Sequence, residues 1–380
     1  MTNTVTVRVA SSQRDRRRFQ HLPWAIYAAD PNWVPPILSQ ERPLLGWPDW
    51  RGRRHPFFDE AEMVTLIAER DSHVLGRVAV FVNNVHNRKY NEKRGFFGFF
   101  ECIDDAAVAK ALFDAGREWL AERGMTACRG PVNPSLNYTC GLLVDGFTSP
   151  PVFLMTYNPP YYQALIGACG FSKAQDLYAY EMDVPLLAKL VARYKPAVLS
   201  ALDGRGLTVR PLDTSRFEDE ISCYLDLYNS SLDGTWGFTP LQPREVKQIA
   251  RDLRHIITPE LAAFAMVDGK AIGAVLALLD YNQIIRTING RLYPLGLFKL
   301  MWGRKRISVA RAMAVTMSPA YQHSGLSIVL IDHLVEAARA WGLTNWEFSW
   351  VLESNTNSRG TLERLGTRRS KTYRIYDRAL

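Results

Sequence analysis

Ala312-Met-Ala-Val-Thr-Met317 and Gln322-His-Ser-Gly-Leu-Ser327, separated by four residues, are the most informative segments of this chain. The first has the apolar and β-branched composition of a strand, and the residues from Ser327 to Trp341 have the apolar spacing of a helix. A helix start carries unpaired backbone N–H groups at the positive end of the helix dipole, and glycine lets the backbone approach a ligand closely. The pattern predicts a strand, an anion-binding turn and a helix. An ordinary capped helix start is the alternative.

The charges around this turn favour the anion-binding interpretation. From Tyr281 to Ile331 the chain has no Asp or Glu, although the same stretch has seven Lys or Arg residues. Such an excess of cations suits the phosphate groups of a cofactor. We therefore expect the end of the strand and the turn to contact that cofactor through Thr316, Met317, Gln322, His323, Ser324, Gly325, Leu326 and Ser327.

The rest of the chain predicts an α/β (α+β) protein with two similar halves. Residues 61–200 and 201–380 each suggest, in order, a hairpin, a third strand, a long helix, a strand, a short helix and a final strand. A helix near 185–200 joins the halves, and residues 152–157 are expected to form a strand of the first half. Residues 1–60 are rich in Pro and Trp, and predict an irregular arm with one short helix.

The turn resembles the pyrophosphate-binding turn of the GNAT superfamily of acyl-CoA N-acyltransferases, [Gln/Arg]-x-x-Gly-x-[Gly/Ala]. The matching positions are Gln322, Gly325 and Ser327. The family's downstream Asn-x-x-Ala…Gly signature is similar to Asn355, Ser358 and Gly366. This resemblance covers about 200–380 and implies acyl-CoA as co-substrate and a further carrier contact at Asn355. Together with the shared order of elements in the two halves, it predicts two tandem GNAT-like mixed-sheet domains. Leu362 stands where the family often has a Tyr that protonates the leaving thiolate.

The first half lacks such a turn. Its counterpart, Glu101-Cys-Ile-Asp-Asp105, is acidic and has no glycine, so it would repel a pyrophosphate. We therefore expect residues 61–200 to be a GNAT-like domain on the acceptor side that does not bind CoA. Its loop from Arg129 to Gly146 is rich in amide and hydroxyl groups. The loop predicts a substrate site that includes Asn137 and Tyr138, or else an elaborate connection held by local hydrogen bonds.

N-acylation requires a group that accepts a proton from the amine, which then attacks a thioester and expels a thiolate. Three residues are catalytic candidates. Glu353 follows the predicted fifth strand of the second half, and Glu101 ends a Phe-rich strand where desolvation would raise its pKa. His86 lies in Asn83-Asn-Val-His-Asn87. A structural role is the alternative for each of the three, and no metal site is expected.

An insertion over 282–306 combines large apolar side chains, including Trp302, with cations and no acids. Within it, residues 284–306 have the composition of a segment that lies in the interface of an anionic membrane. In that case the substrate would be a lipid, with Trp302 as a contact. A β-hairpin extension packed on the first half is the alternative.

Over its whole length the chain also resembles a group of bacterial two-domain GNAT-like proteins that includes a ceramide synthase. The segments that carry the likeness are Pro31-Asn-Trp-Val-Pro-Pro36, Gly95-Phe-Phe-Gly-Phe-Phe-Glu101, Arg129-Gly-Pro-Val-Asn-Pro-Ser135 and Tyr157-Asn-Pro-Pro-Tyr-Tyr162. The likeness implies transfer of a fatty acyl group from acyl-CoA to a lipid amine such as a sphingoid base. A soluble acetyltransferase of small amines or proteins, and a non-catalytic GNAT pair that binds CoA or a partner, remain as alternatives.

Composition excludes several other classes of protein. The chain has 380 residues, 47% of them hydrophobic, and a net charge of +8, which is modest for a nucleic-acid binder. Its five cysteines form no CxxC pair, which argues against a disulfide scaffold and a zinc finger and fits a reducing cytoplasm. No apolar run is long enough to span a bilayer. We expect a cytoplasmic protein, with attachment to the cytoplasmic face of the inner membrane if residues 284–306 bind lipid.

Overall fold

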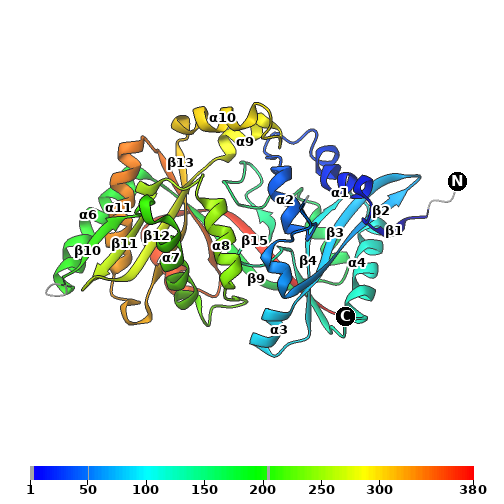
Figure 1. The fold of residues 1–380 in the computed structure, drawn as a ribbon, viewed down its shortest axis with the longest axis horizontal. Coiled ribbons are helices and arrows are strands. Elements are labelled where there is room, and N and C mark those ends of the chain that lie inside the picture. The colour runs from blue at the N-terminus through cyan, green and yellow to red at the C-terminus, as the bar shows by residue number, and fades with distance from the viewer. Residues whose placement is uncertain (1–3, 50, 203–205) are drawn as a thin grey trace. The chain divides into compact units, whose positions relative to one another are not determined.

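The computed structural model describes residues 4–49, 51–202 and 206–380. These residues form the mixed α/β structure that the sequence predicts (Figure 1). Two compact units are present. Unit 1 consists of the described residues up to Leu177, together with Ile285–Gly296 and Lys371–Leu380. Unit 2 consists of the described residues of Tyr178–Ile284 and Leu297–Ser370. The division into functional domains at 60/61 and 200/201 stays a prediction.

Unit 1 contains a mixed sheet covered by α4 (Ala106–Ala121). Its strands are β1 (Thr6–Val9), β2 (Ala61–Arg70), β3 (His73–Asn83), β4 (Arg94–Cys102) and β5 (Ala127–Gly130). The first four are antiparallel neighbours in chain order, and β5 is parallel to β4. Leu112 and Phe113 of α4 join Phe97 of β4 in one buried cluster, because the apolar stripe of the helix faces the apolar side of the sheet.

The N-terminal arm is more regular than expected. It contains β1 and two helices, α1 (Gln13–Ile26) and α2 (Leu38–Leu44), before the short helix η1 (Pro56–Asp59). The prediction of one short helix was therefore wrong. Ser12 caps α1 by accepting a hydrogen bond of 3.1 Å from the N–H of Asp15, and Phe19 packs with Trp47 in a second buried cluster. Burial against the sheet stabilises a helix despite the internal Pro23.

The polar loop of unit 1 forms short strands rather than one long connection. They are β6 (Val132–Asn133), β7 (Thr139–Cys140) and β8 (Leu142–Asp145). No strand forms at the predicted position 152–157, where Leu154 has φ +62° and the N–H of Met155 bonds to the carbonyl of Val152. The left-handed conformation of Leu154 and the turn that follows it interrupt the extended backbone that a strand at this position would need. Two further helices of this unit are α3 (Asn84–Tyr90) and α5 (Tyr162–Ala168).

Unit 2 repeats the mixed-sheet pattern. Its strands β10 (Thr208–Pro211), β11 (Ala262–Val267), β12 (Lys270–Leu279) and β13 (Val309–Met317) are antiparallel neighbours, and β14 (Asn345–Leu352) is parallel to β13. The helices are α6 (Val184–Ala201), α7 (Phe217–Leu232), α8 (Pro243–Leu253), α11 (Leu326–Trp341) and α12 (Thr356–Arg364), with short turns η2 (Thr214–Arg216), η3 (Pro259–Leu261) and η5 (Pro319–Tyr321). The predicted joining helix corresponds to α6, which packs against α11.

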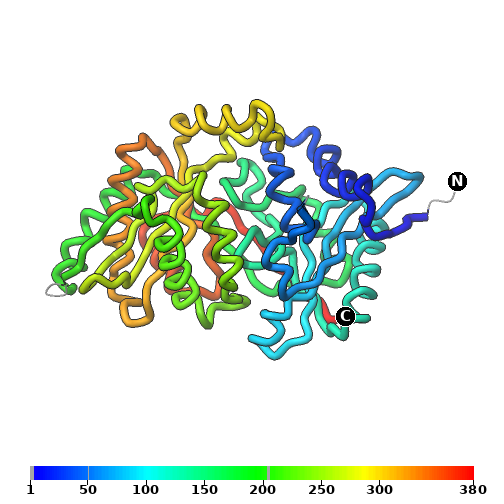
Figure 2. Tube along the Cα trace, viewed as in Figure 1, coloured from blue at the N-terminus to red at the C-terminus, as the bar shows by residue number. Residues whose placement is uncertain are grey.

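Most of the last strand of the chain belongs to unit 1, although the residues before it belong to unit 2. β15 (Arg368–Ala379) contributes Lys371 onward to unit 1, where Tyr376–Ala379 pair antiparallel with β5. Figure 2 shows the red C-terminus ending among the cyan elements of unit 1. Conversely, β9 (Ser172–Asp183) supplies its second part to unit 2 and neighbours β14 in the strand order. Each unit is therefore completed by a strand from the other half of the sequence.

The insertion over 282–306 consists of helices, so the β-hairpin alternative is wrong. They are α9 (Asn282–Ile288), α10 (Gly296–Gly303) and the short η4 (Arg304–Arg306). Six large apolar side chains of this segment are exposed, by 40–80%: Tyr293, Leu295, Leu297, Phe298, Met301 and Trp302. None of the helices in the described residues has both the length and the apolar character that crossing a bilayer requires.

Candidate functional site

A turn with two residues of positive φ lies at the start of α11, where the sequence predicts anion binding. Gly325 is the N-cap residue and has φ +80°, and His323 also has a positive φ of +68°. Ser324 braces the turn, since its Oγ donates to the carbonyl of Tyr321 (2.7 Å) and accepts from the N–H of Leu326 (3.3 Å). Within the part of the chain that the structure describes, the N–H groups of His323, Gly325 and Ser327 have no hydrogen-bond acceptor. These groups, at the positive end of a helix dipole, can bind an anion.

The turn lies at the surface and is supported from one side. His323 is exposed and Gln322, Ser324, Gly325 and Ser327 are half-buried. A Cβ atom added to Gly325 would lie 2.8 Å from Cγ2 of Val198 on α6. The position therefore favours glycine for two reasons, namely its positive φ and its close contact with α6. Leu326 is buried in contrast, so its side chain anchors the helix and only its backbone belongs to the turn.

β13 and β14 pair over only part of their length. Their parallel register runs from Val309 and Asn345 to Ala312 and Phe348, and both strands continue beyond it. Near the far end of β13, the side chain of Thr316 is buried with its hydroxyl 3.3 Å from the carbonyl of Ala274, and the N–H of Met317 donates to Ser231 (3.3 Å). The side chain of Thr316, predicted to contact the carrier, is therefore directed into the protein rather than toward a ligand.

At the corresponding helix start in unit 1, the first N–H groups of α4 are already bonded within the chain. The carboxylate of Asp105 caps α4 by accepting from the N–H groups of Ala107 (2.9 Å) and Val108 (3.3 Å). The chain also fills the space beside β4, because the side-chain oxygen of Asn133 accepts from the N–H of Phe99 (2.7 Å). A Cβ atom on Gly98 would be only 1.9 Å from the carbonyl oxygen of Val132. The loop after β5 thus occupies the edge of β4.

Glu101, the first catalytic candidate, lies in a polar network within unit 1. Its Oε2 accepts hydrogen bonds from the hydroxyls of Tyr27 (2.8 Å) and Tyr162 (2.7 Å). The guanidinium of Arg77 is 3.8 Å from its other oxygen and 3.0 Å from Glu41. Burial raises the pKa of Glu101 to about 7, against the opposing charge of Arg77 and the tyrosine hydrogen bonds. A carboxyl poised near neutrality can accept or donate a proton.

The raised pKa of Glu101 has a consequence for stability. In the unfolded chain the carboxyl titrates near 4.5, so between pH 4.5 and 7 the folded protein binds more protons than the unfolded one. The free energy of unfolding should therefore fall as pH rises through this window, by up to about 3 kcal/mol. Glu101→Gln should remove this part of the slope, as measured by urea unfolding at a series of pH values.

Glu62→Gln is the matched control, because Glu62 is on β2 of the same unit with its side chain 67% exposed. It should unfold with the same pH dependence as the unaltered protein. The raised pKa of Glu101 would be contradicted if Glu101→Gln and the unaltered protein differed in stability by the same amount at every pH from 4.5 to 8.

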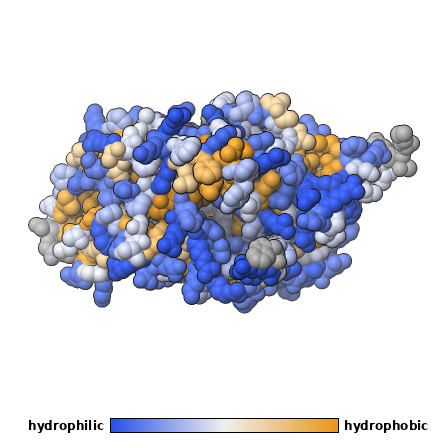
Figure 3. Space-filling view, turned by 45° about the horizontal axis from the view of Figure 1, so that its top comes forward, coloured by the Kyte–Doolittle hydropathy of each residue, from blue (hydrophilic) through white to orange (hydrophobic). Residues whose placement is uncertain are grey.

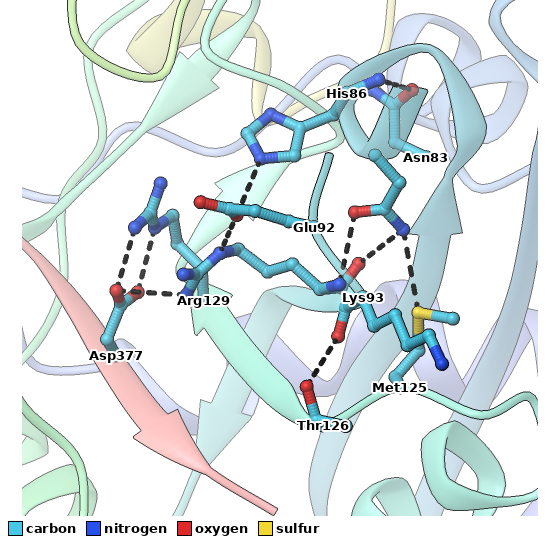
Figure 4. A network of polar contacts seen from close by, with 10 residues as sticks. Asn83, His86, Glu92, Lys93, Met125, Thr126, Arg129 and Asp377 are labelled. Carbon is cyan, nitrogen blue, oxygen red and sulfur yellow. Dashed lines mark hydrogen bonds and ion pairs between the residues drawn. The ribbon is translucent and has the colours of Figure 1, made fainter. Parts of the chain in front are cut away.

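His86, the second candidate, lies in a separate network of unit 1 (Figure 4). Its ring is buried against Phe96 and Tyr90, and Nε2 is 3.4 Å from the carboxylate of Glu92. Burial lowers its pKa to about 4, although Glu92 acts in the opposite direction. Glu92 also accepts from Arg94. A neutral, enclosed imidazole in such a network has the character of a structural residue.

Glu353, the third candidate, directly follows β14 and belongs to the same unit as the turn. It is half-buried, and its Oε1 accepts from the hydroxyl of Tyr178 (3.2 Å). Nearby, Asn355 is the N-cap of α12 and its side-chain oxygen accepts from the N–H of Ser358 (3.1 Å). The side-chain N–H donors of Asn355 stay available to a carrier in this arrangement.

The three predicted substrate contacts are on different elements. Asn137 and Tyr138 are half-buried in the loop between β6 and β7 of unit 1, where the ring of Tyr138 contacts His55 at a centroid distance of 5.8 Å. Trp302 is 80% exposed on α10 in unit 2. The described residues contain no cluster of three or more side chains suited to a metal ion.

Sequence reasoning missed a buried polar group in unit 2. Arg311 on β13 and Glu347 and Ser349 on β14 are 5%, 2% and 3% exposed. The guanidinium of Arg311 bonds to the hydroxyl and carbonyl of Ser349, whose hydroxyl donates to Glu347 (2.5 Å). The sequence offered one signal for this group, namely a charged residue in the interior of each of two mostly apolar strands. Charged residues at such positions are buried only when they are paired, so a pair between the two strands could have been expected.

Known proteins share this architecture and part of this sequence. Residues 224–367 match the model of the acetyltransferase (GNAT) family. The chain is 34% identical over 375 residues to bacterial ceramide synthase of Caulobacter vibrioides, covering 96% of this chain and 94% of that protein. It is 29% identical over 392 residues to Protein YghO of Escherichia coli, with 100% and 98% covered. A solved tandem GNAT protein from the clavulanic acid biosynthesis pathway has the same fold, with a TM-score of 0.55 over 99% of this chain and 98% of that one, at 12% identity.

Proposed function

Because the chain belongs to the GNAT acetyltransferase family and is an N-acyltransferase, we propose that it transfers a fatty acyl group from acyl-CoA to a long-chain amine, as in ceramide synthesis. The observation that carries the acyl-CoA part is the turn at α11. Its N–H groups at His323, Gly325 and Ser327 suit a diphosphate in charge and hydrogen-bonding chemistry. The self-capped α4 of unit 1 offers no comparable group, which supports a single carrier site in unit 2.

The reaction requires two proton movements. The amine nitrogen forms a bond to the thioester carbonyl carbon, the C–S bond breaks, and the departing thiolate takes up a proton while the amine loses one. Glu353, in the unit of the turn, and Glu101, with its pKa near 7, are the residues we propose as proton acceptors. His86 is less suited, because its imidazole is enclosed and bonded to Glu92. Leu362 has no titratable group, so the proton for the thiolate must come from elsewhere.

The acceptor that we propose is a sphingoid base or a similar lipid amine. This part rests on the identity to a protein named bacterial ceramide synthase and on the apolar patch of α10, formed by Leu297, Phe298, Met301 and Trp302. The patch is exposed by 40–80%. Figure 3, in which the α9 and α10 side is turned forward, shows hydrophobic side chains at the surface among hydrophilic ones.

We further propose that this patch attaches the protein to the cytoplasmic face of the inner membrane. Five exposed cations of the 282–306 insertion support an anionic lipid surface as the partner: Arg286, Arg291, Lys299, Lys305 and Arg306. No acidic residue lies between Tyr281 and Ile331 to oppose that attraction. Apolar side chains bordered by cations are typical of segments that lie in a bilayer interface.

The test is a turnover assay with the full chain, palmitoyl-CoA and sphinganine. We expect thiol release together with an N-acylated product, detected by mass spectrometry. If acetyl-CoA and a small amine react while sphinganine does not, the chain is instead a soluble acetyltransferase. If CoA binds and no amine gives thiol release, the pair of domains is a non-catalytic CoA-binding module.

A further inference from the structure

Arg311, Glu347 and Ser349 lie where the pairing of β13 and β14 ends. Arg311 is opposite Glu347 in the parallel register, and the last pair after it is Ala312 with Phe348. Ser349 is therefore the first β14 residue beyond the ladder. All three polar side chains are buried in unit 2. Buried charge is costly unless it is paired and hydrogen-bonded, so the position of this group needs an explanation.

The contacts join the two strands through a side chain. Nη2 of Arg311 donates to the carbonyl of Ser349 (3.0 Å), and Nε donates to that carbonyl (3.2 Å) and to the hydroxyl (2.9 Å). Ser349 in turn donates its hydroxyl proton to Glu347 (2.5 Å). A planar guanidinium with several fixed donors holds two neighbouring acceptors in a defined geometry, which an ammonium group cannot do. The strands are thus connected by Arg311 just past the end of their backbone pairing.

The group lies on the face of the sheet away from α11. A Cβ atom on Gly273 of β12 would contact Leu326 and Leu330 of α11 (3.2 and 3.4 Å), so that residue faces the helix. Leu278, five residues along the same strand, faces the other way because side chains alternate. Arg311 is opposite Leu278 in the register and therefore shares its face. Arg311 cannot act by contacting a ligand at the α11 turn directly.

We propose that Arg311, held by Ser349 and Glu347, is a positioning residue that sets the separation of β13 and β14 and thereby the affinity for acyl-CoA. The inference rests on the proposed function. β13 and β14 continue past Ala312 and Phe348 without further pairs between them in the described register. An acyl-CoA with its diphosphate at the α11 turn can place its pantetheine arm between the ends of β13 and β14 that are not paired with each other in this register. Loosening the connection would weaken binding of the carrier, whereas binding of the amine would be unaffected.

Arg311→Lys in the full chain tests this role, since lysine keeps the charge and loses the forked geometry. We expect the Kd for CoA, from calorimetry, and the KM for palmitoyl-CoA to rise at least about tenfold. The KM for sphinganine should stay within about threefold. Ser349→Ala should have a smaller effect, because Arg311 keeps its bonds to the carbonyl of residue 349.

Arg210→Lys is the matched control. Arg210 is on β10 of the same unit, the terminal strand in the order and three strands from β13, and bonds to Glu220 at 2.6 and 2.8 Å. It should lower thermal stability and leave the Kd for CoA unchanged. If unaltered protein binds CoA and Arg311→Lys binds it equally well, or if Arg210→Lys weakens binding as much, this inference is wrong and the proposed function stands. If the unaltered protein binds no CoA, the proposed function fails, and this inference with it.

Discussion

Gly325→Glu should abolish measurable CoA binding, with affinity reduced on the order of a hundredfold or more. Gly325 has φ +80°, a conformation that costs a residue with a Cβ roughly 1–2 kcal/mol. The new Cβ would also lie 2.8 Å from Val198, so the turn or α6 must shift. A displaced turn loses charge-assisted N–H hydrogen bonds, each of which contributes about 1.5–3 kcal/mol. The added carboxylate further repels the diphosphate.

Steric contact with α6 is one cause of this loss, because a Cβ atom at position 325 would point toward Val198 of that helix. Gly325→Ala should therefore weaken binding without any added charge, and Val198→Ala should restore part of it by making room. Gly342→Ala is the control. Gly342 has φ +87° at the other end of α11, and its Cβ would contact nothing. Calorimetry and CoA-dependent thermal shifts measure these effects. Full CoA affinity in Gly325→Glu would exclude this turn as the carrier site.

Replacing Phe298, Met301 and Trp302 together with serine should reduce binding to anionic vesicles at least about tenfold. These side chains are 54%, 64% and 80% exposed, so they add little to the stability of the folded chain and their loss should leave the melting temperature nearly unchanged. Transfer of a large apolar side chain out of water contributes about 1.5–3 kcal/mol when complete. Co-sedimentation with phosphatidylglycerol-containing vesicles measures the effect.

Charge reversal separates the electrostatic part of this binding. Lys299→Glu with Lys305→Glu should weaken binding to phosphatidylglycerol vesicles and have little effect with phosphatidylcholine alone, since each cation contributes about 1 kcal/mol at an anionic surface. Tyr194→Ser with Leu199→Ser on α6 is the control, because each side chain is 40% exposed and lies outside the patch. Equal loss in the control, or vesicle binding by the triple variant like that of the unaltered protein, would exclude α10 as the membrane contact.

Local patterns in the sequence predicted the parts of this protein that depend on short-range physics. The glycine turn before Ser327 was predicted because a helix start, a missing side chain and nearby cations are all visible in neighbouring residues. The acidic counterpart at Glu101–Asp105 was recognised in the same way, and Asp105 does cap α4. Desolvation of Glu101 at the end of a Phe-rich strand followed from composition, and its pKa is indeed raised.

Pairings between distant residues could not be predicted from these patterns. Strand β15 has an ordinary strand pattern, and nothing local shows that Tyr376–Ala379 pair with β5 rather than with the preceding half. The arm was predicted to be mostly irregular because its prolines are visible in the sequence, whereas the cluster that stabilises α1 around Phe19 comes from tertiary contacts. Likewise, the partner of Arg311 depends on which strand lies beside β13.

The sequence alone therefore determined the mixed α/β class, the glycine turn before α11 and the apolar, cationic insertion, because dihedral preference, charge and hydrophobicity act within a few residues. Only the tertiary structure decided which strands complete each unit, that the insertion is helical, and that Arg311 is bonded to Ser349 at the end of the β13–β14 ladder. These features depend on contacts between residues far apart in the chain, for which a single sequence carries no local signal.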